Sequence, residues 1–197
     1  MHLFSSIIDP KLVTLLNEGA VGVMPTDTVY GLVCRATDER AVEKLYSLKD
    51  RENKPGTLIA GKLQQLIDLG LRARYLKAVE GYWPNPLSVI IPCGEDLGYL
   101  HQGKRSLAVR IPADKKIREL LMQTGVLLTS SANQPGESTA HNLTDAQNYF
   151  GDSVDFYVDG GEIYDHMPST VIRIVDDAIE ILREGAVKID ENGRISA

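Results

Sequence analysis

The sequence has few cysteines and few aromatic residues. Its 197 residues include two cysteines, and Phe, Trp and Tyr together make up 6% of the chain. Cys34 and Cys93 lie far apart in apolar segments without CxxC spacing, so we expect buried free thiols of a cytosolic protein, neither a disulfide nor metal ligands. So few aromatic side chains offer no evident stacking platform for single-stranded nucleic acid.

The chain also lacks an excess of positive charge. Lys and Arg number 21 against 27 Asp and Glu, which gives a formal net charge of −6. Binding along a phosphate backbone needs a basic face, so this balance argues against broad binding of nucleic acid. A small basic pocket remains compatible with this balance.

Long hydrophobic runs are missing as well. No run approaches the roughly 20 apolar residues that span a bilayer. The N-terminal segment MHLFSSIIDP has neither a basic region nor a long apolar region of the kind found in secretory leaders. We therefore expect a soluble, cytoplasmic protein that does not associate with membranes.

Several common catalytic motifs are absent or incomplete. The four histidines (His2, His101, His141 and His166) show no HxxxH spacing and no neighbouring cysteine, so we expect no protein-held transition metal. No GxSxG nucleophile motif occurs. GTLIAGKL, residues 56–63, matches the first seven positions of the phosphate-binding pattern GxxxxGK[ST], but Leu63 lacks the hydroxyl and an apolar strand replaces the loop, so we reject a P-loop.

The hydrophobic patterns predict a mixed α/β (α+β) fold. A chain of this length fits one domain that buries roughly 70% of its unfolded surface. We expect a single domain over residues 1–197, with a core at about 5–187 and a short polar C-terminal tail. Strands are predicted at 20–25, 29–35, 57–60, 87–93, 106–112, 126–132, 154–161, 169–175 and 178–184, and helices at 10–18, 37–48, 62–69, 72–82, 114–123 and 143–150. Their irregular alternation favours a twisted, mainly mixed sheet with flanking helices.

Two predicted strands end abruptly in polar clusters. MPTDTVYGL, residues 24–32, interrupts apolar sequence with Thr, Asp and Thr at 26–28, and LLTSSANQPG, residues 127–136, follows the same pattern. One such cluster alone would be a turn whose side chains bond their own backbone. Because α/β proteins commonly place ligands at strand ends, two of them favour a pocket.

The charged segment KDRENK, residues 49–54, could contribute to the same pocket. If it is extended, Lys49 and Arg51 point the same way, and a Lys beside the planar fork of an Arg suits the charge of a triphosphate. The alternative is that Lys49 only complements the negative end of a preceding helix.

One charge lies inside an apolar strand pattern. Arg110, in LAVRIP, must be paired or face a ligand, because an unpaired buried charge is costly. Asp27 and a bound carboxylate are equally good partners at this stage. Ser169 at a strand start and Arg183 near a strand end raise parallel possibilities.

The motifs PTDTVYGL, LKDR, SLAVRIP, SSAN, PSTV and LREGAV occur in this order from Pro25 to Val187. In this combination the chain resembles the YrdC-type threonylcarbamoyl-AMP synthases, in their short single-domain form. The resemblance implies a sheet and helices around a concave basic pocket. It also implies an enzyme that converts L-threonine, bicarbonate and ATP into threonylcarbamoyl-AMP and pyrophosphate. ATP is a substrate here and is expected to enter as its Mg²⁺ complex. A separate transferase complex, a candidate partner of this chain, then modifies adenosine in tRNA. We expect tRNA binding by this chain itself to be weak or absent, given its net negative charge.

The resemblance also implies roles for individual residues. Catalytic roles fall to Lys49 and Arg51, and threonine binding falls to Thr28, Arg110 and Ser169. Nucleotide binding falls to Arg51, Lys54, Ser106, Ser131, Asn133, His141 and Arg183. Asp27 is expected to brace the turn or to pair with a cation such as Arg110.

Two alternatives remain at this stage. The chain could be an RNA-binding module with the same fold, which the negative net charge and few aromatic residues disfavour. It could also be a paralogue that acts on another nucleotide or small molecule, which the intact KxR and SxN motifs disfavour.

Overall fold

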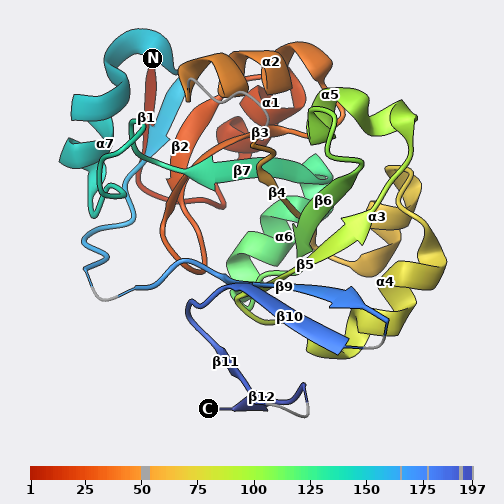
Figure 1. Cartoon of the computed structure of the whole chain (residues 1–197). Coiled ribbons are helices and arrows are strands. Elements are labelled where there is room, and N and C mark those ends of the chain that lie inside the picture. Colours follow the sequence, from red (N-terminus) through yellow and green to blue (C-terminus); the bar gives the residue numbers. More distant parts are fainter. Residues whose placement is uncertain (50–53, 165, 177, 191–192, 197) are drawn as a thin grey trace.

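Apolar runs with period-two alternation become the strands of one large sheet (Figure 1). A computed structural model describes residues 1–49, 54–164, 166–176, 178–190 and 193–196. The strands are β1 (His2–Phe4), β2 (Gly22–Pro25), β3 (Tyr30–Arg35), β4 (Thr57–Ile59), β5 (Leu87–Pro92), β6 (Ser106–Arg110), β7 (Leu127–Ser131), β8 (Phe156–Val158), β9 (Thr170–Val175), β10 (Ala178–Arg183), β11 (Lys188–Ile189) and β12 (Ile195–Ser196).

Four of the helices have a side chain that caps their N-terminus. Asp9, Asp38, Asp114 and Asn142 each accept a backbone N–H of the first turn, which satisfies a donor that the helix itself cannot pair. The α-helices are α1 (Pro10–Asn17), α2 (Glu39–Leu48), α3 (Leu63–Asp68), α4 (Ala73–Val79), α5 (Gly98–His101), α6 (Lys115–Thr124) and α7 (Leu143–Phe150).

The sheet mixes parallel and antiparallel neighbours. Ten strands of the described residues pair in the order β1-β8-β2-β3-β7-β4-β6-β5-β9-β10. The β4/β6 and β5/β9 pairs are parallel, whereas β7 is antiparallel to both β3 and β4. The predicted mixed α/β architecture, a large mixed sheet with flanking helices, is confirmed.

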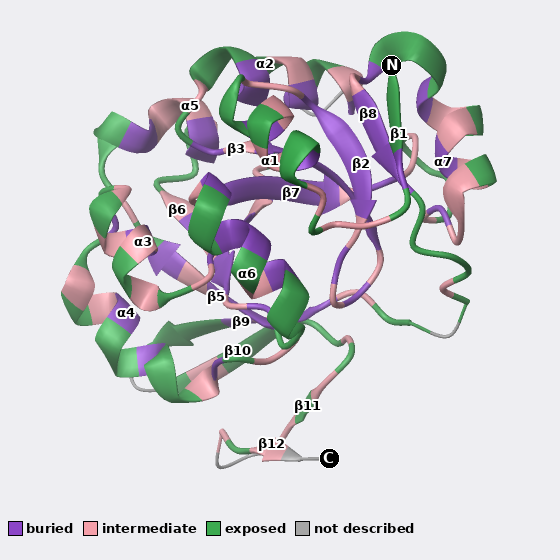
Figure 2. Ribbon diagram, turned by 180° about the vertical axis from the view of Figure 1, so that it is seen from behind, coloured by how far each residue is buried: buried purple, intermediate pink, exposed green. Residues whose placement is uncertain are grey.

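Helices cover both faces of this sheet, and neighbouring residues of a strand enter different cores. Leu127 packs in a cluster with α1 and α6, whereas Leu128 packs in the larger cluster that includes α2, α4 and α7. Ile59 and Leu58 divide in the same way. We refer to the side that holds Leu127 and Ile59 as the α1/α6 face. Figure 2 shows α1 and α6 lying across it.

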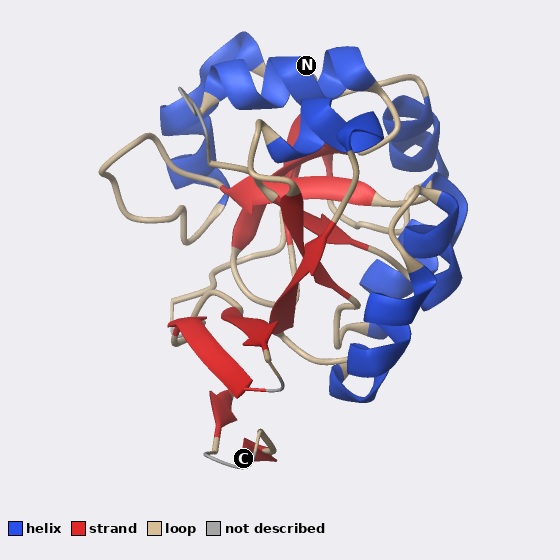
Figure 3. Cartoon of the chain, turned by 45° about the vertical axis from the view of Figure 1, so that its right-hand side comes forward, coloured by secondary structure: helices blue, strands red, loops and turns tan. Residues whose placement is uncertain are grey.

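Three features depart from the predicted elements. Strand β1 was not predicted; it pairs with β8 at one edge of the sheet, and its last residue, Phe4, is buried. The Gly-rich segment at 94–103 contains α5, and β11 and β12 form a hairpin inside the polar tail. Figure 3 shows this hairpin below the helices and the main sheet. No helix in the described part of the chain is long and apolar enough to cross a membrane.

Candidate functional site

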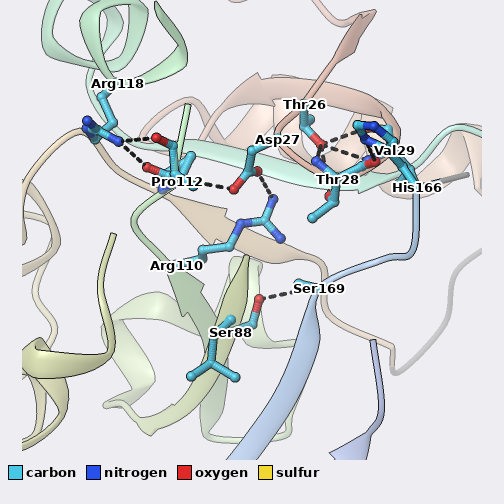
Figure 4. Close-up of polar contacts among 12 residues, drawn as sticks. Thr26, Asp27, Thr28, Val29, Ser88, Arg110, Pro112, Arg118, His166 and Ser169 are labelled. Carbon is cyan, nitrogen blue, oxygen red and sulfur yellow. Dashed lines mark hydrogen bonds and ion pairs between the residues drawn. The ribbon is translucent and has the colours of Figure 1, made fainter. Parts of the chain in front are cut away.

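The polar turn between β2 and β3 is organised by Thr26. Its Oγ1 donates to the Val29 carbonyl at 2.7 Å and accepts the Val29 N–H at 3.3 Å. The same oxygen lies 3.0 Å from Thr28 Oγ1. This pattern is the local side chain-to-backbone bonding expected of a threonine in a turn. Figure 4 shows the Asp27 side chain pointing toward Arg110 of β6, with Thr28 next to it.

Asp27 holds Arg110 in place. Its Oδ1 lies 2.9 Å from Arg110 Nη2, and the two side chains are only 2% and 4% exposed. Asp27 Oδ2 accepts the N–H of Ala113 at 3.0 Å, which links the turn to the segment that follows β6. The predicted pairing of Asp27 with Arg110 is therefore confirmed, and it explains how a charge can occupy an apolar strand pattern.

Arg110 still has hydrogen-bonding capacity that the protein does not use. Burial lowers the pKa of Arg110, and the charge of Asp27 opposes that shift, so the guanidinium stays protonated. Its Nε is buried and makes no hydrogen bond to any described residue. Figure 4 shows the second terminal nitrogen directed away from Asp27, toward the space between Thr28 and Ser169. The arrangement suits an anionic ligand there.

Ser169 is held by two neighbours. Arg183 donates to the Ser169 carbonyl through Nε at 3.0 Å and Nη2 at 2.7 Å, and Nη2 also donates to Ser169 Oγ at 3.0 Å. Ser88 Oγ lies 3.0 Å from the same hydroxyl. Gly185 permits the close approach, because a Cβ there would lie 2.2 Å from the Pro168 carbonyl oxygen.

These groups line one cavity of about 230 Å³ on the α1/α6 face of the sheet. Of the predicted site residues, it brings together Thr28, Arg110, Ser131, Ser169 and Arg183. The remaining lining residues are Thr26, Val29, Gly31, Pro55, Gly56, Thr57, Ile90, Ala108, Thr129, Ser130, Pro168 and Val171. The volume falls below the ~300–1,000 Å³ typical of drug-sized pockets, so it suits a molecule the size of an amino acid.

Lys49 and Asn133 form a second polar cluster beyond Ser131. The buried Lys49 ammonium donates to the carbonyl of Ser131 at 2.9 Å, to Asn133 Oδ1 at 2.9 Å and to the Asn133 carbonyl. Asn133 Oδ1 also accepts the Ser131 hydroxyl at 2.7 Å. Lys49 of the KxR motif thus contacts both Ser131 and Asn133 of the SxN motif. Its positive charge lies at the end of β7.

Other predicted nucleotide-binding residues lie outside the cavity lining. Lys54 is exposed, and its backbone N–H donates to the Gln102 side chain at 3.0 Å. Ser106 shares the strand face of Arg110, four residues away and so about 13 Å along β6 at ~3.3 Å per residue. His141 lies against Tyr164, with ring centroids 5.4 Å apart. Arg51 lies outside the described residues. The roles of all four stay predictions.

The sequence interpretation missed Ser88 and Thr57. Ser88 is fully buried beside Ser169, and Thr57 lines the cavity. A lone serine inside the apolar run LSVIIP was the available signal for Ser88, the same kind of signal that singled out Arg110. Within the described ranges, no group of three or more His, Cys, Asp and Glu side chains could hold a metal ion.

The family model Sua5/YciO/YrdC, described as "Telomere recombination", matches residues 14–185. A threonylcarbamoyl-AMP synthase of Photobacterium profundum is 33% identical over 178 residues, which cover 83% of this chain and 96% of that protein. Another of Idiomarina loihiensis is 36% identical over 142 residues, covering 68% and 76%.

Solved structures agree with these matches. Pyrococcus abyssi Sua5 complexed with L-threonine superimposes with a TM-score of 0.82 at 25% identity over 94% of this chain. The match covers 57% of that Sua5 chain, so the present chain spans little more than half its length. Escherichia coli YciO superimposes with a TM-score of 0.76 at 25% identity, covering 89% and 87% of the two chains.

Proposed function

We propose that this chain, which belongs to the Sua5/YciO/YrdC family, is an L-threonylcarbamoyladenylate synthase. It makes threonylcarbamoyl-AMP and pyrophosphate from L-threonine, bicarbonate and ATP, for threonylcarbamoyladenosine modification of tRNA. The enzymes of Photobacterium profundum and Idiomarina loihiensis carry this activity in their names. The RNA-binding module and the paralogue gain no support from these comparisons.

The observation that carries the proposal is the small cavity with a fixed cation. Arg110 is oriented by buried Asp27, and the hydroxyls of Thr28 and Ser169 line the same space. A guanidinium presents donors in a planar fork that matches a carboxylate. In the proposed complex, Arg110 and Ser169 bind the carboxylate of threonine and Thr28 contacts its polar groups.

The nucleotide binds beyond Ser131 in this proposal. Lys49 and Arg51 neutralise charge on the phosphates, and the other nucleotide contacts come from Lys54, Ser106, Ser131, Asn133, His141 and Arg183. ATP enters with Mg²⁺, an oxygen-seeking cation that binds substrate phosphates and one or two protein carboxylates at most. The cluster of Lys49 with Asn133 supports this placement, because it brings a positive charge next to the cavity.

The chemistry requires positioning and charge neutralisation by the protein. The amine of threonine and bicarbonate form a carbamate with loss of water. One carbamate oxygen then forms a bond to the α-phosphorus of ATP as the bond to the pyrophosphate oxygen breaks. Holding three anionic groups in line lowers this barrier without a covalent enzyme intermediate. The product passes to a transferase complex that acts on tRNA, in the cytoplasm.

The deciding experiment measures pyrophosphate release. Purified protein is mixed with MgATP, bicarbonate and one amino acid at a time, and we expect release that depends on L-threonine and on bicarbonate. Release that is independent of threonine would refute the proposal. Threonylcarbamoyl-AMP should appear in the same reactions in equal amount, measured by mass spectrometry.

A variant tests the assignment of the cavity. Thr28→Val keeps the side-chain shape and removes one hydroxyl, so the KM for threonine should rise about fivefold, the factor expected from one net hydrogen bond. Thr14→Val is the matched control, because the Thr14 hydroxyl bonds Pro10 O on the exposed side of α1. Equal effects in both variants would contradict the assignment.

A further inference from the structure

The hydroxyl of Ser88 lies beneath the cavity and has one partner. Ser88 is fully buried on β5, and among the described residues Ser169 Oγ is its hydrogen-bond partner, at 3.0 Å. The register of β5 with β6 pairs Val89 with Val109. One residue further along, Ser88 comes opposite Arg110, so Ser88 lies between Arg110 and Ser169 in the sheet order β6-β5-β9.

The direction of the Ser88–Ser169 hydrogen bond follows from counting donors and acceptors. A serine hydroxyl has one donor hydrogen and two acceptor lone pairs, whereas an Arg only donates. Arg183 Nη2 therefore donates to Ser169 Oγ, which occupies one lone pair. If Ser169 donated to Ser88, the buried Ser88 hydrogen would have no acceptor, and an unsatisfied buried donor is costly. Ser88 must donate to Ser169.

With both lone pairs occupied, Ser169 can offer a ligand only its hydrogen. We infer that Ser88 is a positioning residue: by donating to Ser169, it fixes the Ser169 hydroxyl as a donor toward the carboxylate of the bound amino acid. Arg110 also offers only donors to the same space (Figure 4). The two groups together select an anion with two acceptor oxygens and reject a group that carries N–H donors.

This inference deepens the proposed function and rests on it, because it takes an amino acid as the ligand. The discriminating pair of ligands is L-threonine and L-threoninamide, which replaces one carboxylate oxygen with an NH₂ donor. In the wild-type protein neither Ser169 nor Arg110 can accept that donor. In Ser88→Ala, one lone pair of Ser169 becomes vacant and can accept it.

The experiment is calorimetric titration of wild type and Ser88→Ala with both ligands, at a pH where both amines are protonated. We expect the preference for L-threonine over L-threoninamide to fall about fivefold or more in Ser88→Ala, the factor that one net hydrogen bond contributes. A purely structural loss would weaken both ligands together and leave their ratio unchanged, which would overturn the inference. Thr124→Val is the control, because it removes a buried hydroxyl that bonds Leu120 O within α6, and Thr124 is not among the residues that line the cavity.

The same titrations distinguish a failure of the proposed function from a failure of the role assigned to Ser88. If wild-type protein binds neither ligand, the proposed function fails. If wild type prefers L-threonine and Ser88→Ala keeps the full preference, the proposed function stands and the role of Ser88 is refuted. Should Ser88→Ala fail to fold, Ser88→Cys carries the comparison, because a thiol of similar size is a weak donor and should give an intermediate preference.

Discussion

The buried pair of Asp27 and Arg110 should stabilise the fold as well as orient the site. Asp27→Asn keeps an oxygen that can accept the Ala113 N–H, yet it removes the negative charge beside a cation that is only 4% exposed. Breaking a buried ion pair from one side costs about 3–5 kcal/mol, because the other charge stays buried. Since Asn retains one acceptor, we expect a loss near the lower limit, about 3 kcal/mol in the free energy of unfolding.

An exposed pair supplies the control. Arg173 and Glu180 approach to 2.6 Å, closer than the 2.9 Å of the buried pair, but their side chains are 47% and 49% exposed. Solvent screening reduces such a pair to ~0–1 kcal/mol. Glu180→Gln should therefore cost little, although distance alone would rank this pair as the stronger one.

The assay is urea unfolding followed by the fluorescence of the single tryptophan, Trp83, with thermal unfolding beside it. A loss of about 3 kcal/mol should lower the Tm by roughly 6–12 °C, at ~2–4 °C per kcal/mol for a chain of this size. In an Arg110→Met background, Asp27→Asn should cost much less, because no buried cation remains. Additive effects of the two changes, or equal losses in Asp27→Asn and Glu180→Gln, would refute the reasoning.

Three further predictions follow from local contacts. Gly31→Ala should weaken threonine binding in calorimetric titration while the protein still folds, because the added Cβ would lie 2.6 Å from Thr129 Oγ1 in the cavity wall. Burial alone would raise the pKa of Asp155, but hydrogen bonds from the Lys44 ammonium and a backbone N–H outweigh it and lower that pKa. The pKa of Asp155 is thus lower in the folded state than in the unfolded state. The stability that its ionised form contributes is therefore present above the unfolded pKa, near 4, and is lost as pH falls through the folded pKa. Asp155→Asn should remove this contribution, so the free energy of unfolding should fall less steeply toward acid pH than in the wild type. Burial raises the pKa of the Cys34 thiol, so a thiol reagent at pH 8 should leave it unlabelled until urea is added.

Local chemistry in the sequence predicted most elements of the fold. Asp is a typical N-cap residue, and Asp9 and Asp38 stand at the starts of α1 and α2, where each accepts a backbone N–H. Strand order was not predictable in this way, because it depends on pairings between distant residues, such as His2 with Phe156. The short β1 is recognised as a strand only through that partner.

The candidate site was partly predictable for the same reason. Arg110 stood out because a charge in an apolar strand needs a partner, and Asp27 was a candidate for that partner. The hydrogen bonds from Arg183 to Ser169 were not predictable from the sequence, because they depend on the antiparallel pairing of β10 with β9. Ser88 could have been noticed as a serine in an apolar strand pattern, but its proximity to Ser169 follows only from the pairing of β5 with β9.

The alternation of side chains between the two faces of each strand produces both the core and the cavity. On the α1/α6 face, Leu127 packs in the core, whereas Thr129, two residues further along the same strand face, lines the cavity. Ile59 and Thr57 make the same change on the neighbouring strand β4. The cavity thus arises where small polar side chains replace large apolar ones. Because side chains alternate between faces, a slip of one residue would bury these hydroxyls in the opposite core and fill the cavity with leucines. The register that the two cores enforce is therefore also what places the ligand-facing groups.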